Sequence, residues 1–209
     1  HNDVDLLYYN GLTNVRAELL PSVMITDGID RRVDKLVDHY NDIESTFSHN
    51  QNDIIIGGNW VWAYGGFDSY QVGLEISDDI TAVTTGRMKP EEEQVVKHLP
   101  WMLWKEWINT LSTFRYGIQL GTASAGTFNL NCSFHGIPCI GYSNVNTQDI
   151  LHPLTTVEVG DIDNAKHIAK KLKDKKFYDL CSETTIKRYE TFYTEEIFTK
   201  NIKELMKTI

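Results

Sequence analysis

The chain has 209 residues, of which 41% are hydrophobic and 23% charged, so it is long enough to bury a sizeable core and is neither disordered nor fibrous in composition. Its formal net charge of -9 repels a phosphate backbone, which argues against a nucleic-acid polymer as partner. The three cysteines, Cys132, Cys139 and Cys181, are odd in number and lack CxxC spacing. This pattern argues against a disulfide framework or a zinc site and predicts a reducing, cytoplasmic location.

The first 21 residues are expected to be a linker or the remnant of a preceding domain, and residues 22–209 a single domain. Strands are predicted over 5–10 and 22–26, with a short helix over 13–20 between them. Residues 30–48 keep their apolar positions at three- and four-residue spacing, which predicts an amphipathic helix. No apolar run reaches the 18 residues of a membrane span.

From residue 52 onward, short apolar runs alternate with helical patterns, which is typical of parallel βαβ units. The run at 52–58 is apolar throughout, as in a strand buried on both faces of a sheet. Pro90 stands where the first residue of a helix tolerates proline. The further predicted strands are 79–86, 115–122, 136–142 and 155–161, and the predicted helices are 90–99, 99–114, 129–135, 163–174 and 183–209.

Glycine follows three of these predicted strands, after Ile56, Thr85 and Leu120. A doubly wound sheet binds its ligand outside the carboxyl ends of its strands. Glycine at that edge lets backbone N–H groups approach a phosphate, and the start of the following helix adds a partial positive charge. The edge therefore suits a nucleotide or phosphorylated ligand, although glycine also ends strands simply by forming turns.

The stretch 120–142 has a distinctive order: a strand, a small-residue loop with Gly126, a helix, then Gly136 and Pro138 before another strand. This order resembles the donor-binding half of GT-B glycosyltransferases, which transfer a sugar from a nucleotide-sugar. In that family the segment carries two glutamates eight positions apart, followed by Gly-x-Pro. Here Ala123 and Asn131 stand at the two glutamate positions.

The resemblance extends over about residues 22–209. ITDGID (25–30) is similar to the family's step into its carboxyl-terminal domain, and IIIGG (54–58) and AVTTG (82–86) to its first two strands. VGDIDNAKHIAKKLKD (159–174) and RYETFYTEEIFTKNIKELM (188–206) are similar to its last strand and closing helices. The implied fold is α/β, a doubly wound, Rossmann-like parallel sheet with helices on both faces.

The resemblance also implies an activity. A sugar would pass from a nucleoside-diphosphate sugar, with UDP or GDP, to a saccharide, lipid or protein acceptor, without a metal or other cofactor. An acceptor-binding domain, upstream or in a partner chain, would supply the general base, so no catalytic residue is assigned here. The donor-binding residues implied are Gly57, Gly58, Asn59, Arg87, Leu99, Pro100, Trp101, Ser124, Ala125, Gly126, Thr127 and Asn131.

Simpler interpretations remain for several residues. Tryptophans at 101, 104 and 107 have the spacing of a packed helix face, so Trp101 is either a core residue or a stacking partner for a base. Asp161 and Asp163 precede a helix and are expected to cap it rather than to bind a metal. His135 is expected to be a partly buried helix end. Two other functions stay open: a nucleotide-sugar epimerase of the same architecture and a non-catalytic binding or assembly module.

Overall fold

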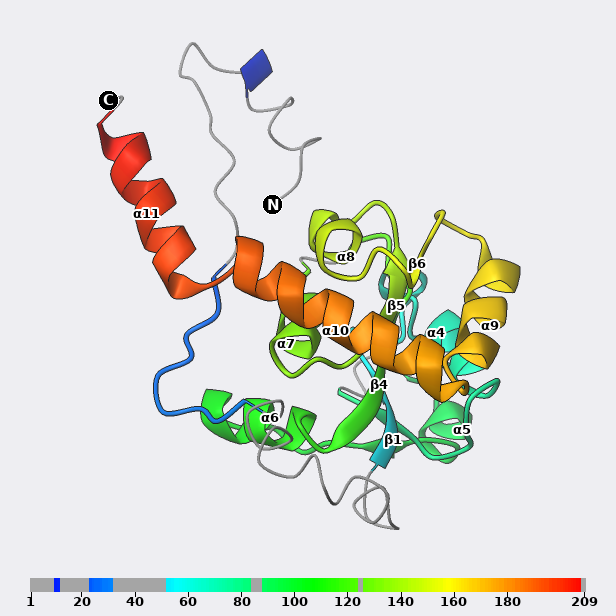
Figure 1. The fold of residues 1–209 in the computed structure, drawn as a ribbon. Coiled ribbons are helices and arrows are strands. Elements are labelled where there is room, and N and C mark those ends of the chain that lie inside the picture. Colours follow the sequence, from blue (N-terminus) through cyan, green and yellow to red (C-terminus); the bar gives the residue numbers. More distant parts are fainter. Residues whose placement is uncertain (1–9, 12–22, 32–51, 84–87, 124–125, 208–209) are drawn as a thin grey trace, which may run out of the picture.

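A six-stranded, wholly parallel sheet forms the centre of the molecule, with strand order β3-β2-β1-β4-β5-β6 (Figure 1). The computed structural model describes residues 10–11, 23–31, 52–83, 88–123 and 126–207. The strands are β1 (Asn52–Ile56), β2 (Ile80–Ala82), β3 (Lys97–His98), β4 (Phe114–Gln119), β5 (Cys139–Tyr142) and β6 (Thr156–Val157). The order reverses between β1 and β4, which places a topological switch point at their carboxyl ends.

Strand β1 shows why the sheet is covered on both faces. Ile54, Ile55 and Ile56 are all fully buried, and successive side chains of a strand point to opposite faces. Ile54 and Ile56 belong to an apolar cluster with Val72, whereas Ile55 belongs to a second cluster with Phe128. A continuous apolar run therefore packs against helices on both sides, as predicted from the sequence.

Helices cover the two faces of this sheet in pairs. One face carries α4 (Gly66–Gly73) and α9 (Ile162–Lys171), and the other carries α6 (Trp104–Leu111) and α7 (Thr127–Phe134). Together with the strand order, this arrangement confirms the predicted doubly wound α/β fold. The remaining elements are η1, a 3-10 helix (Trp62–Tyr64), α5 (Pro90–Glu93), α8 (Asn146–Leu151), α10 (Lys175–Phe192) and α11 (Glu195–Met206).

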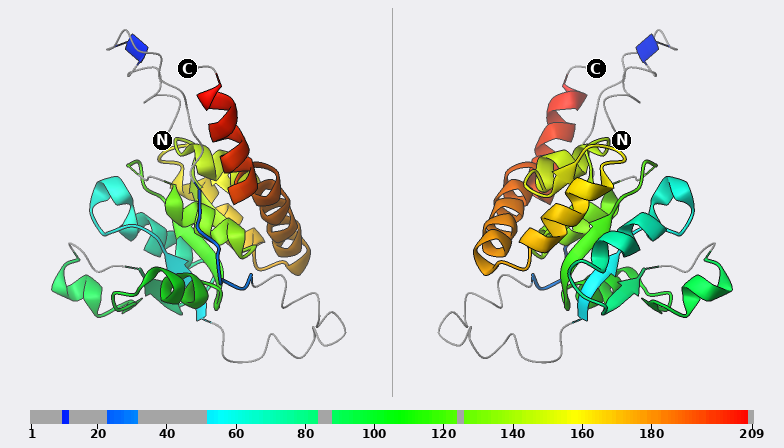
Figure 2. Two further views of the ribbon diagram at one scale, coloured as in Figure 1. Left: turned by 90° about the vertical axis from the view of Figure 1, so that its left-hand side faces the viewer. Right: turned by 90° about the vertical axis from the view of Figure 1, so that its right-hand side faces the viewer.

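The long helix α10 connects the two sides of the molecule. Tyr178, near its start, packs edge-on against Tyr116 of β4 with ring centroids 5.5 Å apart. Tyr189, near its end, packs in the same way against Phe134 of α7 at 5.6 Å. Helix α11 then leads away from the sheet (Figure 2). Its first residue, Glu195, accepts hydrogen bonds from the Thr26 amide (2.6 Å) and hydroxyl (2.8 Å).

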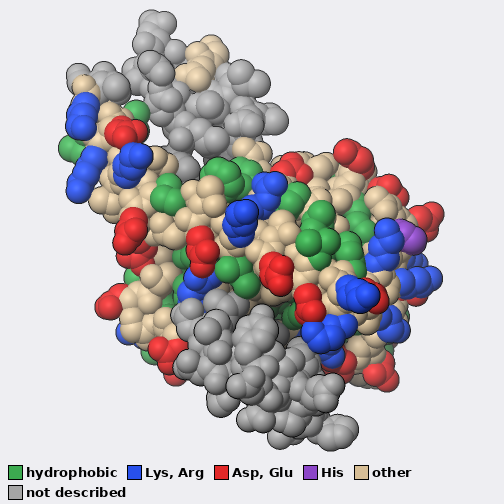
Figure 3. Space-filling view, in the orientation of Figure 1, with side chains coloured by type: hydrophobic (Ala, Val, Ile, Leu, Met, Phe, Trp, Pro, Cys, Tyr) green, Lys and Arg blue, Asp and Glu red, His purple; other side chains and the backbone are tan. Residues whose placement is uncertain are grey.

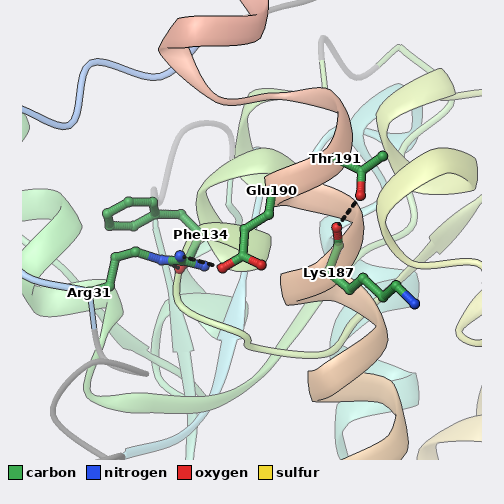
Figure 4. Close-up of polar contacts among 5 residues, drawn as sticks. All are labelled: Arg31, Phe134, Lys187, Glu190 and Thr191. Atoms are coloured by element: carbon green, nitrogen blue, oxygen red, sulfur yellow. Dashed lines mark hydrogen bonds and ion pairs between the residues drawn. The ribbon is translucent and has the colours of Figure 1, made fainter.

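Arg31 joins the segment 23–31 to the helices beneath it (Figure 4). Its Nε donates to the Phe134 carbonyl at 3.0 Å, and its guanidinium pairs with Glu190 of α10 at 2.9 Å. The guanidinium also lies 5.4 Å from the ring centroids of Phe134 and Tyr189. Planar, delocalised arginine suits this combination of stacking and hydrogen bonding. The arginine therefore fixes the segment to the end of α7 and to α10.

Several predicted elements differ from the structure. The strand predicted over 22–26 is irregular over 23–26, because the Thr26 amide bonds to a side chain of α11 instead of to a neighbouring strand. The helix predicted over 90–99 ends at Glu93, because the chain returns to the sheet and pairs Lys97 with Thr81. The predictions over 5–9, 13–20 and 32–48 lie outside the described residues.

Other boundaries moved as well. The helix expected over 99–114 begins only at Trp104, so the three tryptophans do not share one helix face. The closing helix begins at Lys175, eight residues before its predicted start at 183. Helices α4 and α8 were not predicted. The capping prediction was confirmed, since Asp161 accepts a hydrogen bond from the Asn164 amide at 3.1 Å.

Charged side chains mix on the face formed by α9 and α10 (Figure 3). Basic and acidic groups alternate there, with Lys170 paired to Glu75 at 3.3 Å and Lys175 to Asp179 at 2.7 Å. The lysine-rich helix end thus belongs to a solvated surface of mixed sign. Across the described part of the chain, none of the helices combines the length and apolar character of a membrane span.

Candidate functional site

The candidate site lies at the switch point, where β1 and β4 end side by side. Gly57 and Gly58 follow β1, and the Gly57 amide bonds to the Ile118 carbonyl of β4 at 2.9 Å. A Cβ on Gly57 would lie only 2.5 Å from the Phe128 ring, in the first turn of α7. Glycine at 57 therefore allows α7 to approach the end of β1, and the two segments meet as predicted for a shared edge.

The loop after β1 also packs closely on the loop after β4. The Ala63 carbonyl of η1 accepts a hydrogen bond from the Ala123 amide at 3.0 Å, and a Cβ on Gly65 would overlap the Leu120 carbonyl. A Cβ on Gly121 would lie 3.0 Å from the Tyr64 carbonyl oxygen. Glycine therefore permits contact between two backbones here, which is a structural use of the residue.

The amino-terminal turn of α7 faces this edge. Gly126 is its N-cap with φ of +75°, a left-handed conformation that glycine adopts without strain, and it has no side chain to cap the helix. Its carbonyl accepts the first helical bond, from the Leu130 amide at 3.1 Å. Thr127, the first helical residue, is exposed. The backbone donors and dipole of the turn make this end attractive to an anion.

Asn131 lies in the interior, between α7 and α6. It is 6% exposed, and the amide orientation that satisfies its neighbours has the oxygen accept from Trp107 Nε1 at 3.0 Å. The amide nitrogen then donates to the Thr127 carbonyl at 3.1 Å. Asn131 therefore ties α7 to α6, a contact that the sequence did not indicate.

A buried polar network ties the opposite side of α7 to α8. Asn129 donates to the Gln148 side chain, and Gln148 Nε2 in turn donates to the Cys139 carbonyl at 2.9 Å. His152 Nδ1 accepts from the Cys139 amide at 3.3 Å, so its proton is on Nε2, which donates to the Asn129 carbonyl at 2.9 Å. Thr155 adds a hydrogen bond to the Cys139 carbonyl at 2.6 Å.

Burial shifts the pKa of two groups beside this network. Removal from water lowers the pKa of His152 from 6.5 to about 4, although its hydrogen bond to Asn129 acts in the other direction. His152 is therefore neutral at pH 7, with both ring nitrogens bonded. Removal from water also raises the pKa of the Cys132 thiol well above 9.0, and its contact with Cys139 raises it further. Neither group is an accessible acid, base or nucleophile.

The predicted donor-binding residues divide into four groups, one of which is Asn131 alone, buried and bonded to Trp107 of α6. Gly57 packs against Phe128 in the first turn of α7, so the loop of Gly57 and Gly58 meets the helix start of Gly126 and Thr127 at the switch point. Asn59 lies in the loop after β1, and its side-chain oxygen is buried with no hydrogen-bond partner among the described residues. Leu99, Pro100 and Trp101 follow the edge strand β3. Arg87, Ser124 and Ala125 lie outside the described residues.

The surroundings of two predicted side chains are now clear. Trp101 is 86% exposed, so it is not a core residue. His135 lies at the end of α7 as predicted, but it is fully rather than partly buried, with Nε2 2.8 Å from the Ile108 carbonyl. Sequence reasoning did not identify Asn129, Gln148 or His152, because buried polar residues give no periodic signal.

Comparisons with known proteins agree with this geometry. No protein-family model and no curated protein matches the chain. Among solved structures, HepE of Anabaena in complex with UDP-glucose is similar with a TM-score of 0.66 and 10% identity, covering 93% of this chain and 58% of HepE. The glycosyltransferase WaaG is similar at 0.65 and 12%, covering 89% of this chain and 55% of WaaG.

A single domain of another protein is matched almost completely. The carboxyl-terminal domain of LpcC, a group 1 family glycosyl transferase of Francisella tularensis, is similar with a TM-score of 0.55 and 14% identity. The match covers 73% of this chain and 91% of that domain. The chain thus spans little more than half of the longer relatives and nearly all of an isolated carboxyl-terminal domain. It has the fold of the carboxyl-terminal, Rossmann-like domain of GT-B glycosyltransferases.

Proposed function

We propose that the chain binds a nucleoside-diphosphate sugar at the carboxyl edge of β1 and β4 and is the donor-binding part of a glycosyltransferase. One observation carries the proposal: the glycine loop after β1 and the glycine-capped start of α7 meet at the switch point of the sheet. Switch points bind ligands in doubly wound folds, and a helix start binds phosphate.

The chemistry follows from the backbone. A diphosphate leaving group gains negative charge as the bond to the sugar breaks, and fixed N–H dipoles at the start of α7 would stabilise that charge. The partial charge of a helix start is about half a unit, and it acts most strongly where water is excluded. Gly126 and Thr127 would provide these donors. Gly57 and Gly58, which have no side chains, would let the ligand approach the backbone closely.

The identity of the donor is proposed from the structural relatives. HepE is described in complex with UDP-glucose, which makes a UDP-sugar the first donor to test, with GDP and ADP as alternatives. Trp101, exposed after β3, would offer a ring for stacking on the base. The acceptor, a saccharide, lipid or protein, would be bound by another domain or a partner chain.

A second candidate is a binding module that holds a nucleotide-sugar without transferring the sugar. Asn131, at one position where the resemblance places a glutamate, is buried and bonded to Trp107. Ala123, at the other, has no polar side-chain atom. Release of UDP from UDP-glucose by the protein with acceptor present would support transfer, and binding without release would support the module.

Thr127→Glu tests the location of the site with little disturbance of the fold. A carboxylate at the first position of α7 favours the helix dipole, so thermal stability should be unchanged or slightly raised. The same charge repels a diphosphate and should weaken UDP binding by about 10- to 100-fold, on the scale of two charges a few ångströms apart near a surface. Thr127→Gln is the matched neutral control, and isothermal titration gives both affinities.

Two outcomes would contradict the proposal. The first is no heat with UDP, GDP or ADP at millimolar concentration in the unmodified protein. The second is equal UDP affinity in Thr127→Glu and Thr127→Gln. Gly126 is a poorer choice for this test, because its positive φ and the overlap of any Cβ with Thr147 would strain the fold as well as the site.

A further inference from the structure

The loop after β5 and the first turn of α8 hold both described ends of the loop that joins β4 to α7. Asn144 Nδ2 donates to the Thr122 carbonyl at 2.9 Å, and Thr147 Oγ1 donates to the Gly126 carbonyl at 3.1 Å. Thr122 and Gly126 flank the loop immediately before the proposed phosphate-binding turn. We propose that Asn144 and Thr147 are positioning residues for diphosphate binding; this inference rests on the function proposed above.

Thr147 is the stronger of the two contacts because it is buried. It is 6% exposed, and its hydroxyl lies where a Cβ on Gly126 would be. The Gly126 carbonyl thus accepts two hydrogen bonds, one from Thr147 and one from the Leu130 amide at 3.1 Å. These two bonds fix the peptide plane that follows Gly126, and with it the direction of the first amide of α7.

Asn144 acts at the other end of the loop, on the surface. Its partner Thr122 is also tied to the loop after β1, since Thr122 Oγ1 lies 3.3 Å from the Ala63 carbonyl and the Ala123 amide 3.0 Å from the same oxygen. The described start of the loop, Thr122 and Ala123, is therefore bonded to η1 and to Asn144, and its described end, Gly126, is bonded to Thr147. Neither Asn144 nor Thr147 needs to touch a ligand to affect it.

The segment that carries Asn144 and Thr147 is itself firmly anchored. Gln148, the next residue after Thr147, is fully buried and bonds through Nε2 to the Cys139 carbonyl of β5. His152, at the end of α8, bonds to the Asn129 carbonyl of α7. Because α8 is anchored in this way, a hydrogen bond from Thr147 can hold the Gly126 carbonyl in one orientation. A mobile surface side chain could not do so.

Loosening the Gly126 peptide should affect binding of the phosphates more than binding of the base. Stabilisation by backbone dipoles depends on donors that are oriented before the ligand arrives, and small displacements are costly. Loss of the Thr147 hydroxyl would remove one of the bonds that orient the Gly126 carbonyl and would loosen that orientation. Affinity for ligands that use two phosphates should therefore fall more than affinity for ligands that use one.

The test compares Thr147→Val, which keeps the shape and removes the hydroxyl, with Thr147→Ser, which keeps the hydroxyl. Isothermal titration with UDP and UMP gives the ratio of the two affinities. We expect Thr147→Val to lower UDP affinity about fivefold, the scale of one hydrogen bond, and to lower the UDP/UMP ratio, while Thr147→Ser restores both. Asn144→Ala should have a smaller effect in the same direction.

Hydrogen exchange in the ligand-free protein separates this inference from the proposed function. Thr147→Val should speed amide exchange in peptides that cover 122–130, and Thr147→Ser should not. Unchanged exchange would overturn the positioning role, whether or not UDP binds to the unmodified protein. Faster exchange with an unchanged UDP/UMP ratio would overturn its connection to the phosphates. If the unmodified protein binds none of UDP, GDP and ADP, the proposed function and that connection are both refuted; if it binds GDP or ADP in place of UDP, the same ratio is measured with that diphosphate and its monophosphate.

Discussion

The two ends of helix α7 are built in opposite ways. At its carboxyl end the Phe134 carbonyl accepts from Arg31 at 3.0 Å, the His135 ring lies 2.8 Å from the Ile108 carbonyl, and the Gly136 carbonyl accepts from Ser182 at 2.6 Å. At its amino end a glycine cap is followed by exposed Thr127. Hydrogen bonds with three other segments anchor the carboxyl end, whereas the amino end presents backbone to the switch point.

This contrast shows how the first turn of a helix can offer its backbone N–H groups to a ligand and still stay ordered. A turn that leaves its amides free for a ligand must be held through other groups: here Thr147 bonds to the Gly126 carbonyl, and the rest of the helix is anchored by its neighbours. Asn131 bonds to α6 and Asn129 to α8, which fixes the middle of α7 from two sides. The buried amides thus support the open turn, and predictions that weaken the anchors test the comparison.

The largest effect is expected from protonation of His152. Because the pKa falls from 6.5 to about 4 on folding, the unfolded chain takes up the proton first as the pH is lowered. The contribution of His152 to the free energy of unfolding is therefore fully present above pH 6.5 and is lost as the pH falls from 6.5 to 4. The total loss is about 3 kcal/mol. Urea unfolding at several pH values measures this loss.

The control is His152→Gln, which has no titrating group. Its stability at pH 7 should be lower than that of the unmodified protein, because the bonds to Cys139 and Asn129 cannot all be remade. Its free energy of unfolding should then change less between pH 6.5 and 4. An equal pH dependence in both proteins would assign the slope to other groups and contradict the role of His152 as an anchor of α7.

The second prediction concerns the bond between Asn131 and Trp107. Asn131→Ala removes the hydrogen bonds of a buried amide to Trp107 Nε1 and to the Thr127 carbonyl, and should lower the free energy of unfolding by about 2 kcal/mol. Trp107→Phe leaves the buried Asn131 oxygen without this donor and should cost about 1 to 2 kcal/mol. In a double-mutant cycle the two costs should sum to about 1 kcal/mol more than the cost of the double variant. Simple additivity would show that the two side chains do not interact.

Sequence patterns predicted the parts of the fold that follow hydrophobic periodicity. β1 was predicted because Ile54, Ile55 and Ile56 are all apolar. The helix after Gly126 was predicted over 129–135, and α7 begins two residues earlier, at Thr127. The short edge strand β3 was missed because Lys97 and His98 are both exposed and carry no apolar pattern.

The two helices that were not predicted, α4 and α8, lack the residue pattern that is typical of a helix. α4 begins and ends with glycine, which lowers helix propensity. α8 buries Thr147 and Gln148, polar residues that periodicity assigns to the outside. Its role at the candidate site depends on hydrogen bonds between segments distant in sequence, to Gly126 and Cys139, and no local pattern encodes such pairs.

The smallest effect is expected at Arg31, on the anchored end of α7. Arg31→Lys keeps the charge but loses the Nε bond to Phe134 and the stacking on two rings, and should cost about 1 kcal/mol. Glu190→Gln removes only the partly exposed ion pair and should cost about 0.5 kcal/mol or less, since the Glu190 side chain is 54% exposed.

Urea unfolding ranks these two variants, and the ranking tests what holds this end of the helix. A larger loss in Glu190→Gln than in Arg31→Lys would mean that the ion pair, and not the carbonyl bond with its stacked rings, joins the segment 23–31 to α7 (Figure 4). Neither variant should change UDP affinity by more than about twofold, because the amino-terminal turn keeps its own anchors on α6 and α8.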